Sequence, residues 1–157
     1  MKKKKANHSK LIKQSVEELL LKLKVEGKVE VEEVEAGENS HYQINIESPE
    51  TGLLIGYHGE TINSLQLLLG VILYKKLGEW VRVVMDVGEY RKMREESIKE
   101  MVDRIIAEVE RTGESVEMPY LSPLERRIVH MILTEHKTLT SQSHGEGRDR
   151  RVTIKPR

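Results

Sequence analysis

Residues 53–60 read Leu-Leu-Ile-Gly-Tyr-His-Gly-Glu, and this stretch decides the fold of the first half of the chain. Two glycines flank two larger residues at the entrance of an apolar run, in the order Gly56, Tyr57, His58 and Gly59. Glycine adopts positive φ readily and lets a ligand approach where no Cβ is in the way. The first N–H groups of a helix have no intrahelical partner and lie at the positive end of its dipole. The stretch therefore predicts a loop before a helix that suits an anion such as a phosphate.

The segments on either side of this loop give it a context. Alternating apolar residues predict two strands before the loop, joined near residues 37–40, with Val29, Val31, Val34 and Tyr42, Ile44, Ile46 on their buried face. One helical turn is expected over residues 50–55, a helix of about 17 residues after the loop, and a further strand over residues 80–87. This order resembles the KH module, whose GXXG loop clamps about four nucleotides of a nucleic-acid backbone.

Helical periodicity completes the first domain. Ser9 can cap a helix that ends at Gly27, with apolar residues at three- and four-residue spacings: Leu11, Ile12, Val16, Leu19, Leu20 and Leu23. In the helix after the loop, the expected core stripe is Ile62, Leu65, Leu69 and Ile72. The sequence thus predicts an α+β protein with a type II KH domain (αββααβ) over residues 9–87. Residues 1–8 are expected to form a disordered basic arm.

The second domain is expected over residues 88–157. It begins with a long charged helix over residues 89–111, which joins the two domains. Ser122-Pro123-Leu124-Glu125 is a capping box with proline at the first helical position. In the helix that follows, Arg126 and His130 stack four residues apart. They are expected to be exposed, opposite an apolar side made of Leu124, Ile128, Met131 and Ile132.

The end of the chain strengthens this pattern. Two short strands are expected, over residues 137–143 and 150–155, joined by a polar connection. Arg126 and His130 resemble the signature of a small α/β single-stranded nucleic-acid-binding domain named for its Arg-x-x-x-His motif, and residues 140–145 and 150–154 resemble the rest of its pattern. If His130 touches a phosphate, its contribution should fade as the pH rises from about 6 to 8, because the imidazole loses its proton near pH 6.5.

A KH domain followed directly by an Arg-x-x-x-His domain is similar to the bacterial Jag family, also called SpoIIIJ-associated proteins. The resemblance implies single-stranded RNA binding, as an RNA chaperone or post-transcriptional regulator linked to cell elongation and envelope growth. It also implies a small single-KH partner or a homodimer. The implied RNA-binding residues are Gly56, Tyr57, His58, Gly59, Arg126, His130, Ser143, Arg150 and Arg151.

The chain departs from this family in two ways. Many Jag proteins carry an extra N-terminal domain, for which residues 1–7 leave no room, so a role that depends on that domain is not expected here. The centre of the loop, Tyr57-His58, also lacks the Lys or Arg often found in KH loops. Its hold on a phosphate would depend on backbone amides, the Tyr57 hydroxyl and a partly charged His58.

Composition sets further limits. Cysteine is absent, which excludes disulfides and thiolate metal sites. No signal peptide or apolar stretch of roughly 18 residues is visible, so a cytoplasmic protein without a membrane span is expected. The 26 basic residues balance the 26 acidic ones, which argues against a nucleic-acid binder. The charge is uneven, however, because residues 137–157 are predominantly basic, and phosphates respond to local patches.

Other interpretations remain open. Arg126 could pair with a carboxylate of its own domain, His130 could be an ordinary surface residue, and the C-terminal arginines could be a solvated strand edge. A metal-dependent nuclease using His130 or His58 is the main alternative to a non-catalytic protein, although no metal-ligand motif or cofactor motif is present. A third possibility is a protein-interaction module that uses the apolar helix over residues 60–76. The aromatic residues Tyr42, Tyr74 and Trp80 are expected in the core rather than as stacking platforms.

Overall fold

The computed structural model describes residues 2–157, apart from the side chains of residues 2–6 and of Glu38. The chain divides into two compact units, Met1–Arg91 and Lys92–Arg157. The first unit extends past the expected boundary at residue 87 because Tyr90 and Arg91 contact it. The Tyr90 ring lies against Gly59, and the Arg91 Nε donates to the backbone oxygen of Met85 at 2.9 Å.

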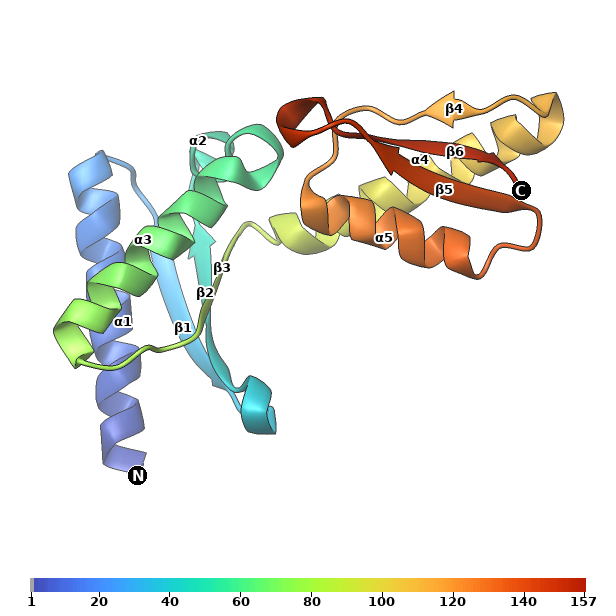
Figure 1. Cartoon of the computed structure of the whole chain (residues 1–157). Helices are drawn as coiled ribbons and strands as arrows, with labels where there is room; N and C mark the ends of the chain where they lie inside the picture. Colours follow the sequence, from blue (N-terminus) through green and yellow to red (C-terminus); the bar gives the residue numbers. More distant parts are fainter. Residues whose placement is uncertain (1) are drawn as a thin grey trace. The chain divides into compact units, whose positions relative to one another are not determined.

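The first unit has the predicted αββααβ order, so this part of the fold prediction is confirmed (Figure 1). Its elements are α1 (Lys2–Leu23), β1 (Lys28–Val34), β2 (His41–Glu47), α2 (Thr51–Ile55), α3 (Glu60–Leu77) and β3 (Val83–Val87), with short 3-10 turns at Gly37–Asn39 and Tyr57–Gly59. Helix α1 begins at Lys2 and not at Ser9. Lysine and alanine, which fill residues 2–6, are good helix formers. Met1 lies outside the described residues.

The sheet of the first unit has the order β1-β2-β3. β2 pairs antiparallel with β1, Ile44 opposite Val31, and parallel with β3, Ile44 opposite Met85. Alternate residues of β2 are buried, and they share one core with α1 and α3, which therefore cover the same face of the sheet (Figure 1). The other face of β2 is polar, and the side chain of Gln43 donates to Asn45 at 3.0 Å. The predicted hairpin is confirmed, but Val34, which was expected on the buried face, pairs with His41 and lies on the other face of the sheet.

Helix α3 is rotated slightly from the predicted position. Its fully buried residues are Ile62, Leu69 and Leu73, whereas Leu65 and Ile72 are half-buried. The expectation for two of the aromatic residues is wrong: Tyr42 is buried, but Tyr74 and Trp80 are exposed. The chain leaves α3 at Gly78 with φ 74° and returns along the outside of the helix. The Trp80 ring stacks on Tyr74 there, with ring centroids 4.7 Å apart.

The second unit packs two helices on one three-stranded sheet. Its elements are α4 (Tyr90–Thr112, whose first two residues cluster with the first unit), β4 (Val116–Glu117), α5 (Pro123–Thr134), β5 (Leu139–His144) and β6 (Arg151–Pro156), with a 3-10 turn at Gly147–Asp149. The strand order is β4-β6-β5, and both pairings are antiparallel. β4 was not predicted, because two residues are too few to show a period of two. The core contains Ile98, Val102, Val129, Leu133, Val152 and Ile154.

Candidate functional site

The glycine loop lies between α2 and α3 in a conformation that depends on its glycines. The φ angles of Gly56, His58 and Gly59 are 71°, 48° and 82°. The Gly56 N–H donates to the backbone oxygen of Gly52 at 2.9 Å and so ends α2. A Cβ on Gly56 would overlap the Thr61 hydroxyl and would lie 2.6 Å from the Thr61 Cβ. Gly56 is therefore required both by its backbone angle and by the close approach of Thr61.

The second glycine places the start of α3. Gly59 is buried and is the residue before the first turn of the helix, where it offers no side-chain acceptor to the amides that follow. A Cβ at Gly59 would lie 3.2 Å from the ring of Tyr90. At the centre of the loop, Tyr57 is 66% exposed and meets the half-buried His58 edge to face, with ring centroids 4.3 Å apart. The structure thus brings all four predicted loop residues together beside the N-terminus of α3.

In the second unit, a buried carboxylate fixes the start of α5. The backbone N–H of Ser122 donates to Glu125 Oε2 at 2.6 Å, and the N–H of Glu125 donates to Ser122 Oγ at 3.4 Å, which is the predicted capping box. Glu125 is only 6% exposed, and its other oxygen accepts from Arg94 Nε at 2.7 Å. These bonds anchor the first turn of α5 and with it the residue that follows, Arg126.

The predicted faces of α5 need correction. The buried row is Glu125, Val129 and Leu133, while Leu124 and Met131, which were expected on the apolar side, are 64% and 61% exposed. The capping box explains this rotation, because it turns the Glu125 carboxylate into the protein, where Arg94 neutralises it. Arg126 and His130 lie in the next row and are half-buried rather than fully exposed. They face the sheet edge at β5.

His130 lies between two serine hydroxyls of β5. Its Nδ1 is 2.7 Å from Ser141 Oγ, and its Nε2 is 2.7 Å from Ser143 Oγ. Arg126 Nη1 donates to the backbone oxygen of Leu121 at 2.7 Å, a different bond from the carboxylate pair considered from the sequence. Burial lowers the pKa of His130 below its usual 6.5, and the charges of Arg126 and Arg150 lower it further. The neutral imidazole is therefore favoured in the unbound protein.

Arg126, His130 and Ser143 line a pocket of about 330 Å³, together with further residues of α5 and one from the segment before β6. The lining residues are Pro123, Arg126, Arg127, His130, Ser143 and Arg150. Four of them were predicted from the sequence. Arg127 was not predicted, although it directly follows Arg126, because the Arg-x-x-x-His motif specifies only the two residues that lie four apart. Among the described residues that line the pocket, three carry a guanidinium group and none carries a carboxylate.

Arg151 is not part of this pocket. Val152 and Ile154 of β6 are buried against the helices, so Arg151 lies on the opposite face of the sheet. Its Nη1 donates to the backbone oxygen of Arg148 at 2.6 Å, and its guanidinium lies 5.7 Å from the centre of the Tyr120 ring. The alternation of residues 151–154 in the sequence already carried this information.

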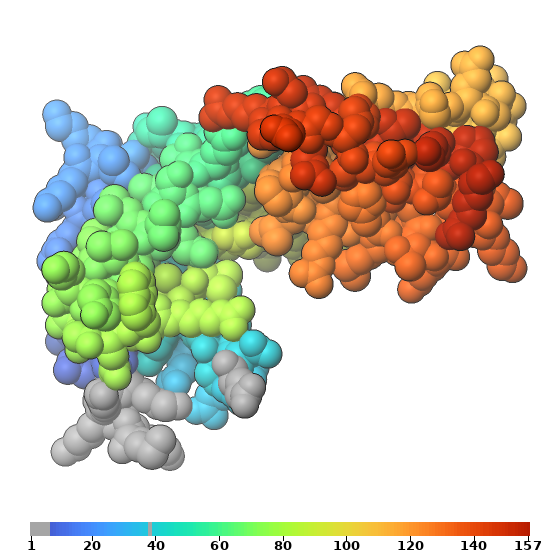
Figure 2. Space-filling view, in the orientation of Figure 1, coloured from blue at the N-terminus to red at the C-terminus, as the bar shows by residue number. Residues whose placement is uncertain are grey.

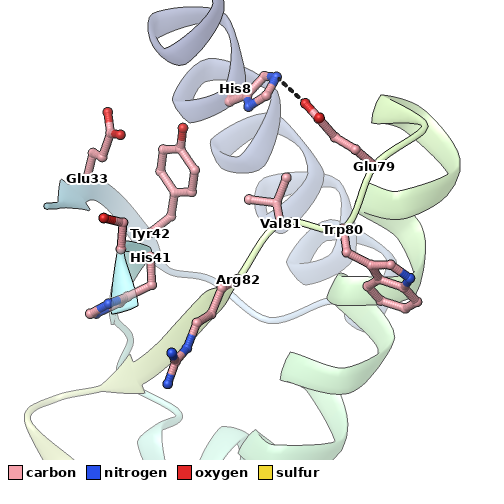
Figure 3. A pocket seen from close by; sticks show the side chains of 9 residues that line it. His8, Glu33, His41, Tyr42, Glu79, Trp80, Val81 and Arg82 are labelled. Atoms are coloured by element: carbon pink, nitrogen blue, oxygen red, sulfur yellow. Dashed lines mark ion pairs between the residues drawn. The ribbon is translucent and has the colours of Figure 1, made fainter. Parts of the chain in front are cut away.

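A second, smaller pocket of about 210 Å³ lies in the first unit, at the end of the sheet beside α1 (Figure 3). Two carboxylates, Glu33 and Glu79, share it with Arg82 and His8, and His8 Nε2 is 3.7 Å from Glu79 Oε1. None of the predicted site residues lies in it. The carboxylates make this pocket less suited to a phosphate than the arginine-lined pocket of the second unit.

Two kinds of feature are absent from residues 2–157. No helix in this range is long and apolar enough to cross a membrane. Among the side chains described there, no three or more His, Cys, Asp or Glu residues come together as ligands for a metal ion.

Comparison with known families assigns both units. Residues 13–85 match the family described as KhpA/KhpB, KH domain, and residues 96–156 match the domain family named for its Arg-x-x-x-His motif. The two matches follow each other in the order inferred from the sequence. They lie on either side of the division after Arg91.

Three relatives, each longer than this chain, carry the same name. RNA-binding protein KhpB of Clostridium symbiosum is 35% identical over 111 residues, which is 71% of this chain and 50% of that protein. The proteins of that name from Lactiplantibacillus plantarum and Bacillus subtilis are 34% and 29% identical, over 36% and 62% of their lengths. The chain thus spans about half the length of the first of these relatives. With both domains matched in this order, the chain belongs to the KhpB/Jag family.

Proposed function

We propose that this protein binds single-stranded RNA through two sites, the glycine loop of the first unit and the arginine-lined pocket of the second. The observation that carries the proposal is the pocket, where Arg126, Arg127 and Arg150 surround one cavity and no carboxylate of the described residues lines it. Guanidinium groups bind phosphate through paired hydrogen bonds as well as charge. The relatives are named RNA-binding protein KhpB, which supports RNA as the nucleic acid.

The glycine loop offers a different kind of contact. A nucleic-acid backbone can approach Gly56 and Gly59 closely because neither has a Cβ. The amides at the start of α3 would then donate to a phosphate, assisted by the helix dipole. Since no Lys or Arg occupies the centre of this loop, its contribution should depend less on salt than that of the pocket.

The proposed role is non-catalytic: the protein would hold single-stranded RNA in the cytoplasm as a chaperone or post-transcriptional regulator. A link to cell elongation follows from the family resemblance alone. The nuclease alternative differs in one simple respect, since a nuclease would shorten labelled RNA over time in a mixture supplied with divalent metal. Recovery of full-length RNA from that mixture is expected.

Replacing Arg126 tests the pocket. Arg126→Ala should weaken binding to a single-stranded RNA oligomer by about three- to tenfold, because one guanidinium contact with a phosphate is lost. The slope of log affinity against log salt should also fall by about 0.7 on single strands. Arg104→Ala is a matched control, since Arg104 is exposed on α4, carries the same charge and does not line the pocket. Fluorescence anisotropy at several salt concentrations measures both quantities.

Comparing the RNA affinities of Arg126→Ala and Arg104→Ala distinguishes the loss of a contact in the pocket from the loss of one positive charge anywhere on the protein. Circular dichroism should show that Arg126→Ala keeps its fold despite the lost bond to Leu121. Equal affinities for the two folded variants would remove the pocket from the RNA-binding surface.

We also propose that the outer surface of α3 binds a protein partner, either a second copy of this chain or a small single-KH protein. Exposed apolar side chains gather there: Leu67, Leu68, Val71, Tyr74 and Trp80. Figure 2 shows this side of the first unit, with α3 in green. Aliphatic residues form much of this surface, which favours a protein over nucleobases, because base stacking uses aromatic rings.

A double substitution on α3 tests this surface. Leu67→Glu with Val71→Glu should weaken self-association, or association with an added single-KH protein, by at least about tenfold, because two charges would be buried in the contact. Leu21→Glu is the control, since Leu21 is 78% exposed on α1 of the same unit. Sedimentation velocity over a range of concentrations gives the association state. Identical sedimentation of the double variant and the wild type, alone and with the partner, would contradict the proposal.

A further inference from the structure

Both ring nitrogens of His130 have hydroxyl partners, and this limits how the site can work. A neutral imidazole has one N–H donor and one bare nitrogen that accepts. Ser141 and Ser143, each 2.7 Å from one nitrogen, must therefore play opposite roles. One serine donates its proton to the ring, and the other accepts the ring N–H and keeps its own proton for a further acceptor.

We propose that Ser141 is a positioning residue that sets the direction of this hydrogen-bond chain from Ser141 through His130 to Ser143. The Ser141 hydroxyl donates to Nδ1, the ring proton resides on Nε2, and Nε2–H donates to Ser143, whose own O–H is thereby directed to an RNA phosphate in the pocket. This inference rests on the proposed function, because it needs a phosphate next to Ser143.

The surroundings of the two serines favour this direction over the reverse. Ser143 lines the arginine pocket and Ser141 does not. In the reverse arrangement the Ser143 hydroxyl would donate to Nε2 and could not donate to a phosphate. The Ser141 hydroxyl would then need another acceptor for its own proton. Among the residues that the structure describes, no side-chain hydrogen bond of Ser141 other than that to His130 is found. A phosphate bound at the pocket therefore stabilises the arrangement with the proton on Nε2.

The charges around the ring favour its neutral form. The charged groups that line the pocket with His130 are Arg126 and Arg127 from α5 and Arg150 from the segment before β6. The groups of β5 that contact the ring, Ser141 and Ser143, are uncharged. Burial and the nearby arginines lower the pKa of His130 below 6.5. The pH dependence of RNA affinity expected from the sequence between pH 6 and 8 is therefore shifted to lower pH values. In this site the arginines provide the positive charge, and His130 orients the hydroxyl of Ser143.

The test uses the full-length protein with a short oligouridylate as the probe. Ser141→Ala should lower the affinity by about three- to tenfold, and Ser141→Thr, which keeps the hydroxyl, should restore it. Gln142→Ala serves as the control from the opposite face of the same strand. The nitrogen chemical shifts of the His130 ring in the RNA-bound wild type at pH 7.5 should show a neutral ring with its proton on Nε2. This measurement needs no variant and would not be moved by a merely structural role of Ser141.

Three results would overturn the proposed hydrogen-bond chain: an RNA-bound ring protonated on Nδ1 alone, a doubly protonated ring at pH 7.5, or wild-type affinity in Ser141→Ala. Arg126→Ala shows whether only the hydrogen-bond chain is wrong or whether the proposed RNA-binding function of the pocket is wrong as well. If Arg126→Ala weakens binding and Ser141→Ala does not, the pocket binds RNA without the hydrogen-bond chain. If neither change alters the affinity, the pocket does not bind RNA and both proposals fail.

Discussion

Division of the chain between Arg91 and Lys92 is expected to lower the affinity for a long single-stranded RNA by about 100-fold compared with the intact protein. Two sites on one chain bind the same strand with a high effective concentration, which reaches the millimolar range for short connections. The division point follows from the structure. A cut at this point keeps the Tyr90 ring next to Gly59 and keeps the hydrogen bond from Arg91 to the backbone oxygen of Met85. The glycine loop therefore retains its contacts within the first fragment.

Titration of RNA oligomers of increasing length measures this effect. Affinity of the intact protein should rise steeply once one oligomer spans both sites, and its salt slope should approach the sum of the two fragment slopes. An equimolar mixture of the two fragments, each checked by circular dichroism, is the control for the covalent connection. If one folded fragment matches the intact chain in affinity and salt slope at every length, the other unit does not bind RNA.

Tyr57→Asp combined with His58→Asp should weaken RNA binding at least tenfold while the fold survives. The two carboxylates would lie beside the phosphate that the loop is proposed to hold. Repulsion between neighbouring like charges costs roughly 1 to 3 kcal/mol of binding free energy. The backbone should tolerate the change. Tyr57 is largely exposed, and aspartate is among the residues that best tolerate the left-handed conformation of His58.

The matched control for this variant is Gln14→Asp combined with Leu21→Asp. Both residues are exposed on α1 of the same unit, and the pair adds the same net charge away from the loop. Anisotropy titrations compare the affinities, and urea unfolding compares the stabilities. A loop variant that is folded and binds RNA as tightly as the control would remove the glycine loop from the interface.

Much of the fold follows from local sequence signals. The glycine pair at Gly56 and Gly59, the alternation in β2 and the capping box at Ser122 each specify a short segment by its own geometry. Such signals depend on neighbours in the sequence, so they can be interpreted without knowledge of the tertiary structure. The order of elements and the grouping of Arg126 with His130 were accessible for this reason.

The features that were missed depend on contacts between distant segments. Burial of Glu125 requires Arg94, 31 residues away, and this pair rotates α5 from the face that apolar periodicity favours. Trp80 lies on the outside of α3 because the chain turns back at Gly78, where Gly70 leaves space beside its ring. Ser141 was also missed, since its proposed role depends on a hydrogen bond to His130 on another element.

The shape of the glycine loop has a consequence for how the protein would choose among RNAs. Thr61 lies close to Gly56 and Tyr90 lies close to Gly59, and both glycines already have positive φ angles in the unbound protein. If the loop binds RNA as proposed, the protein side would lose little conformational entropy, and most of the ordering cost would fall on the RNA strand. Strands whose bases stack weakly lose the least when they are drawn out along the protein. Selection at this loop would then follow from the flexibility of the RNA itself, without any contact to the edges of its bases.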